Sequence, residues 1–309
     1  MIVACVCASL TGTKAESNIF NHLGAGFELG STGIGFEVAT PVTDYLQVRA
    51  GMAIMPSFKV KTFNVDVNGC DMWETAKEKY AEMIVMKPYL KPEDQANMDL
   101  VEEKGWLLLD APNRVDIESK AKLGANFKLL FDVFPFKKSS FHVTAGFYAG
   151  KSQIFDAYTV GNEGQLEALT FFDENYAGKT ISTEGFPGGE QQIHFPDPIS
   201  VTIGGEDFSE NTFYPNGRKV VGYTKVKGFK PYVGIGFGRA VPKKTRLAFA
   251  CDLGVQFWST PKLFIVQKDG PKQVITDGIS DANGGDVVKT MSKIKVYPCL
   301  NFRLTGRIF

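Results

Sequence analysis

Apolar and polar residues alternate with a period of two in eight stretches of the chain. In one of them, Phe141, Val143 and Ala145 alternate with His142 and Thr144. Because successive side chains of a β-strand point to opposite faces, each stretch predicts a strand with one apolar face. The predicted strands cover residues 23–29, 34–39, 46–54, 120–133, 141–150, 229–238, 246–257 and 300–308. We expect the third to continue in extended conformation to about residue 67.

The polar face of these strands is rich in glycine and carries isolated charges of both signs. A cramped lumen accounts for this composition better than a solvated surface does. Buried charges need partners once water is removed, so we interpret the cluster as ion-paired, in preference to an acid–base site. The predicted lumen charge cluster is Glu28, Glu37, Arg49, Lys128, Asp132, Asp252, Arg303 and Arg307.

The connections between the predicted strands mostly alternate between short and long. Short turns lie near Thr43, Pro135 and Pro242, and long segments cover about 67–113, 162–216 and 268–289. Membrane barrels have short periplasmic turns and long outer loops. The turn near 30–33 is the exception, because it is a short turn on the outer side.

We therefore predict an all-β protein, an eight-stranded antiparallel up-and-down transmembrane barrel with long extracellular loops and periplasmic termini. Residues 16–309 form one domain, with the three long segments as insertions. Eight strands leave an interior just filled by side chains. A soluble sandwich also alternates, but the polar face and the loop lengths favour the barrel. The lipid-facing side should include Leu46, Phe127, Phe147, Phe237, Phe249 and Phe302.

Other membrane and export signals are weak. The longest apolar runs, 2–8 and 83–86, fall far short of the about 20 residues of a membrane-spanning helix. We expect residues 1–15 to be an export signal, cleaved after Ala15 and incomplete because its basic opening segment is missing. Lipidation at Cys5 is the weaker alternative.

Composition excludes several classes of function. Lys+Arg and Asp+Glu are both 34, so net charge gives no reason to expect nucleic acid as a partner. The distant Cys70, Cys251 and Cys299 form neither a disulfide framework nor a metal-ligand pattern. We expect no metal and no cofactor.

A resemblance to a known family supports the barrel. From Ile19, the stretch IFNHLGAGFELGSTGIGFEVATPVTDYLQVRAGM resembles small outer-membrane β-barrel proteins of Bacteroides-type bacteria. The stretches KPYVGIGFGRAVPKKTRLAFACDLGVQFWSTPK and VYPCLNFRLTGRIF are similar to the same group. The resemblance covers the predicted strands but not the first two long segments. It implies a location in the outer membrane of a Gram-negative cell, and it brings no enzyme residues because the group is largely uncharacterised.

The long segments contain two predicted helices. Trp73, Ala76, Tyr80 and Met83 share one helical face with Met72, and Pro92 is well placed to begin a second helix. We interpret their apolar face as favouring interaction with a partner, and the alternative is that these helices only cap the barrel mouth.

A candidate loop binding surface lies in the second long segment. Its residues are Phe171, Phe172, Tyr176, Phe186, His194 and Phe195. His194 has Asp173, Glu174, Asp197 and Ser200 near it in sequence, which makes a lipid-modifying enzyme or protease on the outer rim the alternative. A narrow porin is a third hypothesis.

The Gly234-x-Gly236-x-Gly238 run is interpreted as small residues that make room across the lumen, because a dinucleotide site needs a helix after the strand. We predict a non-enzymatic anchor that embeds in the bilayer and presents its loops to an unknown extracellular ligand or protein.

Overall fold

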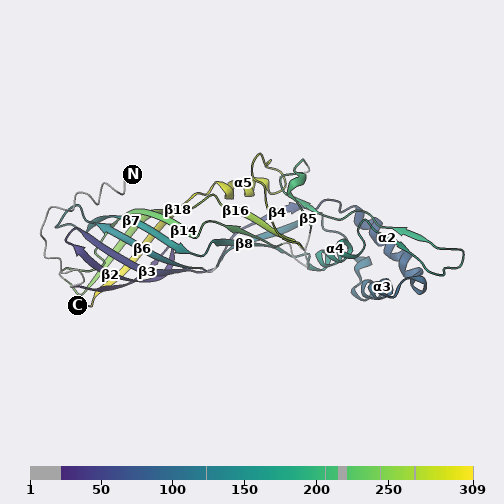
Figure 1. The fold of residues 1–309 in the computed structure, drawn as a ribbon, viewed down its shortest axis with the longest axis horizontal. Helices are drawn as coiled ribbons and strands as arrows, with labels where there is room; N and C mark the ends of the chain where they lie inside the picture. The colour runs from purple at the N-terminus through teal and green to yellow at the C-terminus, as the bar shows by residue number, and fades with distance from the viewer. Residues whose placement is uncertain are drawn as a thin grey trace.

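A computed structural model describes residues 22–122, 124–205, 207–214, 221–243, 245–267 and 269–308. The predicted signal segment, 1–15, lies outside these residues. The molecule is elongated and has three parts along its length: a barrel at one end, an open sheet in the middle and a helical layer at the other end (Figure 1). Among the described residues, no helix is long and apolar enough to cross a membrane.

The barrel consists of eight antiparallel strands, as predicted. They close in the order β1-β18-β15-β14-β7-β6-β3-β2. The strands are β1 (Gly24–Gly30), β2 (Gly33–Thr43), β3 (Leu46–Met55), β6 (Gly124–Val133), β7 (Phe141–Gly150), β14 (Phe229–Phe237), β15 (Leu247–Phe257) and β18 (Val296–Arg307). One boundary was wrong: the predicted strand 120–133 is two strands, because Ala121 ends β5 (Arg114–Ala121) in a different sheet.

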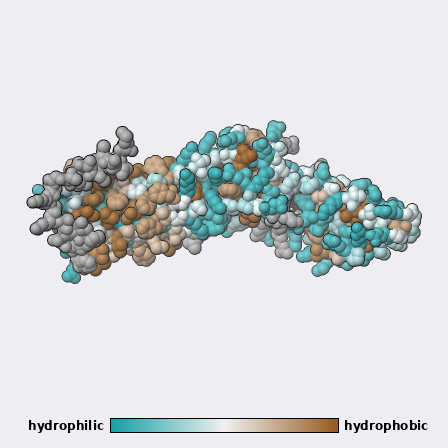
Figure 2. Space-filling model, in the orientation of Figure 1, coloured by the Kyte–Doolittle hydropathy of each residue, from teal (hydrophilic) through white to brown (hydrophobic). Residues whose placement is uncertain are grey.

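Alternation along the barrel strands separates an apolar exterior from a polar interior. In β1, Phe27 and Leu29 are exposed while Glu28 is only 1% exposed. Of the predicted lipid-facing residues, Phe127, Phe237, Phe249 and Phe302 are exposed, and Leu46 and Phe147 are half-buried. Figure 2 shows the resulting apolar surface on the barrel, against the hydrophilic remainder of the molecule. An exposed apolar belt on a closed barrel is the surface of a membrane-spanning protein of outer-membrane type.

The middle part is a six-stranded sheet that continues the barrel wall. Its order is β17-β16-β13-β8-β5-β4. The strands are β4 (Phe58–Asp66), β5, β8 (Gln153–Val160), β13 (Val221–Lys225), β16 (Lys262–Gln267) and β17 (Gly270–Gln273). Five neighbouring barrel strands each lead into one strand of this sheet: β3 into β4, β6 into β5, β7 into β8, β14 into β13 and β15 into β16. These five strands of the sheet lie in the same order as the barrel strands to which they connect. Residues 58–66 account for the extended conformation expected up to about 67.

The distal part is a helical layer built from the first two long segments. It contains α2 (Met72–Val85), η2 (Lys87–Tyr89), α3 (Pro92–Lys104), η3 (Trp106–Leu108), α4 (Glu163–Asn175) and the hairpin β9 (Thr180–Ser182) with β10 (Gln192–His194). Both predicted helices are present. Pro92 opens α3, and Gly105 ends it with a left-handed φ of 65°. The alternative of a cap on the barrel mouth is wrong, because α2 and α3 lie at the end of the molecule away from the barrel (Figure 1). The apolar face of α2 is buried in the core of the molecule.

Three smaller elements cover the middle sheet. They are the hairpin β11 (Val201–Thr202) with β12 (Thr212–Phe213), the short helix η4 (Ser209–Asn211) and α5 (Gly285–Lys293), which leads directly into β18. A continuous apolar core joins these elements, the sheet and the helical layer. The long segments are therefore not separate loops. We call residues 58–121, 153–225 and 262–293 the outer domain.

Candidate functional site

The most concentrated polar chemistry lies inside the barrel. Seven of the eight residues of the predicted lumen charge cluster are 3% exposed or less. They come from six strands and point inward because each occupies the polar register of its strand. The eighth, Arg307, is half-buried at the end of β18, and its Nη1 lies 3.5 Å from the Lys243 carbonyl oxygen. Arg307 is the member that the structure does not bring into the cluster.

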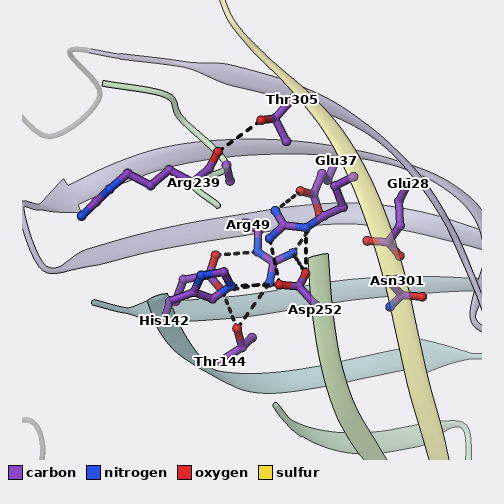
Figure 3. Close-up of polar contacts among 12 residues, drawn as sticks. Glu28, Glu37, Arg49, His142, Thr144, Arg239, Asp252, Asn301 and Thr305 are labelled. Carbon is purple, nitrogen blue, oxygen red and sulfur yellow. Dashed lines mark hydrogen bonds and ion pairs between the residues drawn. The ribbon is translucent and has the colours of Figure 1, made fainter. Parts of the chain in front are cut away.

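Arg49 is the centre of this network (Figure 3). Its guanidinium contacts three carboxylates: Nε lies 2.8 Å from Asp132, and Nη1 lies 3.3 Å from Glu37 and 3.1 Å from Asp252. Arg303 contacts Glu37 at 2.9 Å and Asp252 at 2.7 Å. Fork-shaped guanidinium groups can satisfy several carboxylate oxygens at once, which offsets the cost of removing these charges from water.

Lys128 completes the network toward β1. Its Nζ contacts Glu28 Oε2 and lies 2.8 Å from Glu37 Oε2. Glu28 also accepts a hydrogen bond from Thr32 Oγ1, which lies 3.2 Å away. The predicted ion pairing is therefore present, with four carboxylates against Arg49, Lys128 and Arg303.

His142 was not predicted to belong to the cluster, yet it lies within it. Nε2 is 2.9 Å from Asp252 Oδ1, and Nδ1 is 3.2 Å from the Ser140 carbonyl oxygen. Both ring nitrogens therefore lie next to oxygen atoms of the lumen. The sequence does indicate this placement, because His142 lies on the polar face of the alternating stretch 141–150.

The glycines of β14 make room in the lumen, as the sequence indicated. A Cβ on Gly234 would lie 2.5 Å from the Tyr232 hydroxyl oxygen, and one on Gly236 would lie 2.3 Å from Asp252 Oδ1. Gly238 has a left-handed φ of 109°. These positions serve packing of the lumen and do not form a nucleotide loop.

The lumen is also closed at the end opposite the outer domain. Residues 239–241, between β14 and β15, fold inward, and Arg239, Ala240 and Val241 are each 7% exposed or less. Gln47 Oε1 accepts the backbone N–H of Ala240 at 3.1 Å. Thr305 Oγ1 donates to the Arg239 carbonyl oxygen at 3.1 Å (Figure 3). From the sequence, this segment is expected to be only a short turn.

The candidate loop binding surface is not an aromatic surface. Phe172, Tyr176 and Phe195 are buried in the apolar core of the outer domain, where their rings pack on one another. Phe171 is half-buried against Trp106 at 4.8 Å between ring centroids, and Phe186 is half-buried against Tyr89 at 5.1 Å. The aromatic residues were recognised, but their role is to join α2, α3 and α4.

His194, on β10, is exposed, and its Nδ1 lies 2.6 Å from Thr180 Oγ1. Asp173, in contrast, is largely buried in α4, and its Oδ1 accepts the backbone N–H of Ile199 at 2.9 Å. Burial is the main reason that the pKa of Asp173 rises to about 7. The structure therefore gives His194 and Asp173 different hydrogen-bond partners and different surroundings.

Comparisons with known proteins give only distant likenesses. No protein-family model and no curated protein matches the chain. CarO of Acinetobacter baumannii is similar with 14% identity and a TM-score of 0.40, over 92% of this chain and 96% of that one. CarO2 of the same species is similar with 12% identity and a TM-score of 0.40, over 93% of this chain and 98% of that one. A major outer membrane protein from Thermus thermophilus is similar with 12% identity and a TM-score of 0.31, over 93% of this chain and 98% of that one. At these TM-scores the likenesses carry no argument about this chain.

Proposed function

We propose that the protein is an outer-membrane anchor whose outer domain stands outside the cell and performs binding or adhesion. One observation carries this proposal: five neighbouring barrel strands continue, in the same order, into the sheet that bears the outer domain. Such a connection holds a recognition surface at a fixed height and orientation, because rigid elements position functional surfaces more accurately than free loops do. Membership of the Bacteroides-type family, with termini in the periplasm, is part of the same proposal.

The lumen favours an anchor over a narrow porin. Buried ion pairs fill the middle of the lumen. Toward the outer domain, the rings of Tyr148 and Tyr232 pack on each other with centroids 5.6 Å apart. At the opposite end, residues 239–241 close the lumen. An eight-stranded barrel has no spare width around such a filling. We propose no catalytic role for His194, because its ring contacts the Thr180 hydroxyl while Asp173 contacts the Ile199 backbone.

The test removes the helical layer, together with the hairpin β11–β12 and η4, and leaves the barrel. Residues 68–112 and 161–220 should be replaced together by short turns. Deleting one segment alone would expose the core that they share, for example the contact of Trp73 with Phe172 at 6.2 Å between centroids. The backbone hydrogen bond between Val67 and Asn113, 2.9 Å long, already brings the first pair of ends together.

We expect the shortened protein to form a heat-modifiable barrel and to lose adhesion of expressing cells to immobilised matrix proteins and glycans. The intact protein and a Leu108→Ser variant, altered at a single exposed position, serve as controls. Adhesion that survives in the shortened protein, or intact protein that mediates none across the panel, would contradict the proposal.

A further inference from the structure

An apolar cavity lies just beyond the outer end of the barrel, between the middle sheet and α5. Its volume is about 360 Å³, within the range of small-molecule pockets. Its walls are mainly apolar and include Ile154, Phe155, Trp258, Met291, Ile294 and Tyr297. The rings of Trp258 and Tyr297 stack with centroids 5.0 Å apart and form a flat wall. These groups offer almost no hydrogen bonds to a ligand, so they favour an alkyl chain.

Two smaller cavities, each of about 60 Å³, continue this space in both directions. The deeper one shares Phe155, Val287 and Met291 with it, and the one at the barrel mouth shares Ile154 and Trp258. The deep cavity is lined by Val65 and the mouth by Phe58, both on β4. Seven residue-to-residue steps along the strand separate them, a span of about 23 Å. The row of cavities is therefore long and narrow, with the dimensions of a long acyl chain.

The mouth end differs because it carries lysines. Lys122, Lys151 and Lys230 all line the cavity there. Lys122 contacts Asp156 at 3.1 Å. Lys230 is only 3% exposed, and within the described chain its Nζ contacts two neutral oxygens, Asn126 Oδ1 at 2.8 Å and the Lys151 carbonyl at 3.1 Å.

The surroundings of Lys230 contrast with those of Lys128, deeper in the same lumen, which contacts two carboxylates. A buried ammonium without a counter-ion is costly, and an anion supplied by a ligand would remove that cost. The mouth end is therefore suited to an anionic head group.

One wall of the cavity reaches the surface of the molecule close to the barrel. Ile294 lines it and is 42% exposed, at the junction between α5 and β18. On this side of the barrel, β1 and β2 end in a short turn and do not extend into the sheet. A chain leaving the outer leaflet could therefore enter without crossing the sheet.

We infer that this cavity binds a long-chain fatty acid, with its carboxylate at Lys230 and its alkyl chain between the middle sheet and α5. The site is separate from the adhesive role proposed above, and either proposal can fail without the other.

Trp258 provides the measurement, because it lines the cavity. The full-length protein is reconstituted in lipid nanodiscs and titrated with a fatty acid brominated along its chain, which quenches nearby tryptophan. We expect saturable quenching that is lost in Trp258→Phe and in Val287→Phe, which fills the cavity. Val85→Phe, the same exchange at an 80% exposed site of α2, should behave like the unaltered protein. Heat-modifiable migration shows that each variant is folded.

The head group is tested with the methyl ester of the same acid. Loss of a charge-assisted hydrogen bond should weaken binding about tenfold or more. Lys230→Gln should bring the affinity for the acid down to that for the ester. Quenching that does not saturate, that persists unchanged in Val287→Phe, or that is equal for acid and ester would overturn the inference.

Discussion

At the residue scale, Arg49 shows why the lumen tolerates charge at all. It is fully buried and contacts Glu37, Asp132 and Asp252. No single partner would compensate its burial. Removal of Arg49 takes the ion-pair partner of Asp132 away and leaves Glu37 and Asp252 with Arg303. The charges are therefore mutually dependent, and the network should respond to one substitution as a unit.

We predict that Arg49→Ala lowers the free energy of unfolding by about 3–5 kcal/mol, the cost of leaving buried charge unpaired. Urea titration in lipid vesicles, followed by heat-modifiable migration, measures the effect. Arg307→Ala is the matched control and should stay within about 0.5 kcal/mol, since Arg307 lies outside the network. Equal effects of the two substitutions would mean that the ion pairs do not stabilise the barrel.

The raised pKa of Asp173 predicts that the stability of the outer domain depends on pH. This pKa is raised from 3.8 to about 7, mainly by burial, with Glu174 acting in the same direction and the Ile199 N–H opposing. The folded state therefore holds a proton that the unfolded chain releases, so outer-domain stability should fall as pH rises from about 4 to about 7 and then level off. Fluorescence of the buried Trp73 and Trp106 reports unfolding.

The variant Asp173→Asn should remove this slope and be more stable than the unaltered protein at pH 8. Glu103→Gln, on the exposed face of α3, serves as the control and should retain the slope. A slope that is unchanged in Asp173→Asn would assign the pH dependence to another group.

At the element scale, strand β6 illustrates the facing rule. Phe127 is 45% exposed on the outside, while the next residue, Lys128, is fully buried inside. We predict that Phe127→Arg lowers barrel stability by about 2–4 kcal/mol, the cost of an arginine near mid-bilayer. The substitution Val85→Arg, at an exposed position in the helical layer, should be nearly neutral. A neutral Phe127→Arg, measured in the same vesicles, would contradict the facing assignment.

The strands of the barrel could be predicted because each faces two contrasting environments along its whole length. The alternation that indicates a strand does not indicate its partners, however. Ala121 and Phe127 lie in one alternating stretch, yet Ala121 pairs with Phe58 and Phe155 in the middle sheet. The alternation of apolar and polar residues therefore does not show where one sheet ends and the other begins.

The outer-domain core could not be predicted from local pattern for a related reason. Trp73 and Phe172 are 99 positions apart and meet only because two insertions pack together. Aromatic residues in a segment without strand periodicity look the same whether they line a surface or a core. The lumen residues, in contrast, were recognisable because the strand register places them.

At the scale of the whole molecule, the barrel is filled and closed. Buried side chains occupy the lumen, and residues 239–241 fold into its lower end. We predict that the purified protein inserted into planar bilayers gives no stable open conductance, whereas a general porin tested alongside does. A long-lived open state of the folded protein would contradict the filled lumen.

The central claim is that the barrel spans the outer membrane and holds the outer domain outside the cell. Cysteines introduced one at a time and labelled by a membrane-impermeant maleimide test it most directly. Val85→Cys lies in the helical layer, and Lys138→Cys lies in the exposed turn between β6 and β7, at the other end of the barrel. With the unaltered protein as background, intact cells should label Val85→Cys at once and Lys138→Cys only after the outer membrane is permeabilised. Labelling of Lys138→Cys in intact cells while Val85→Cys stays protected would contradict the account.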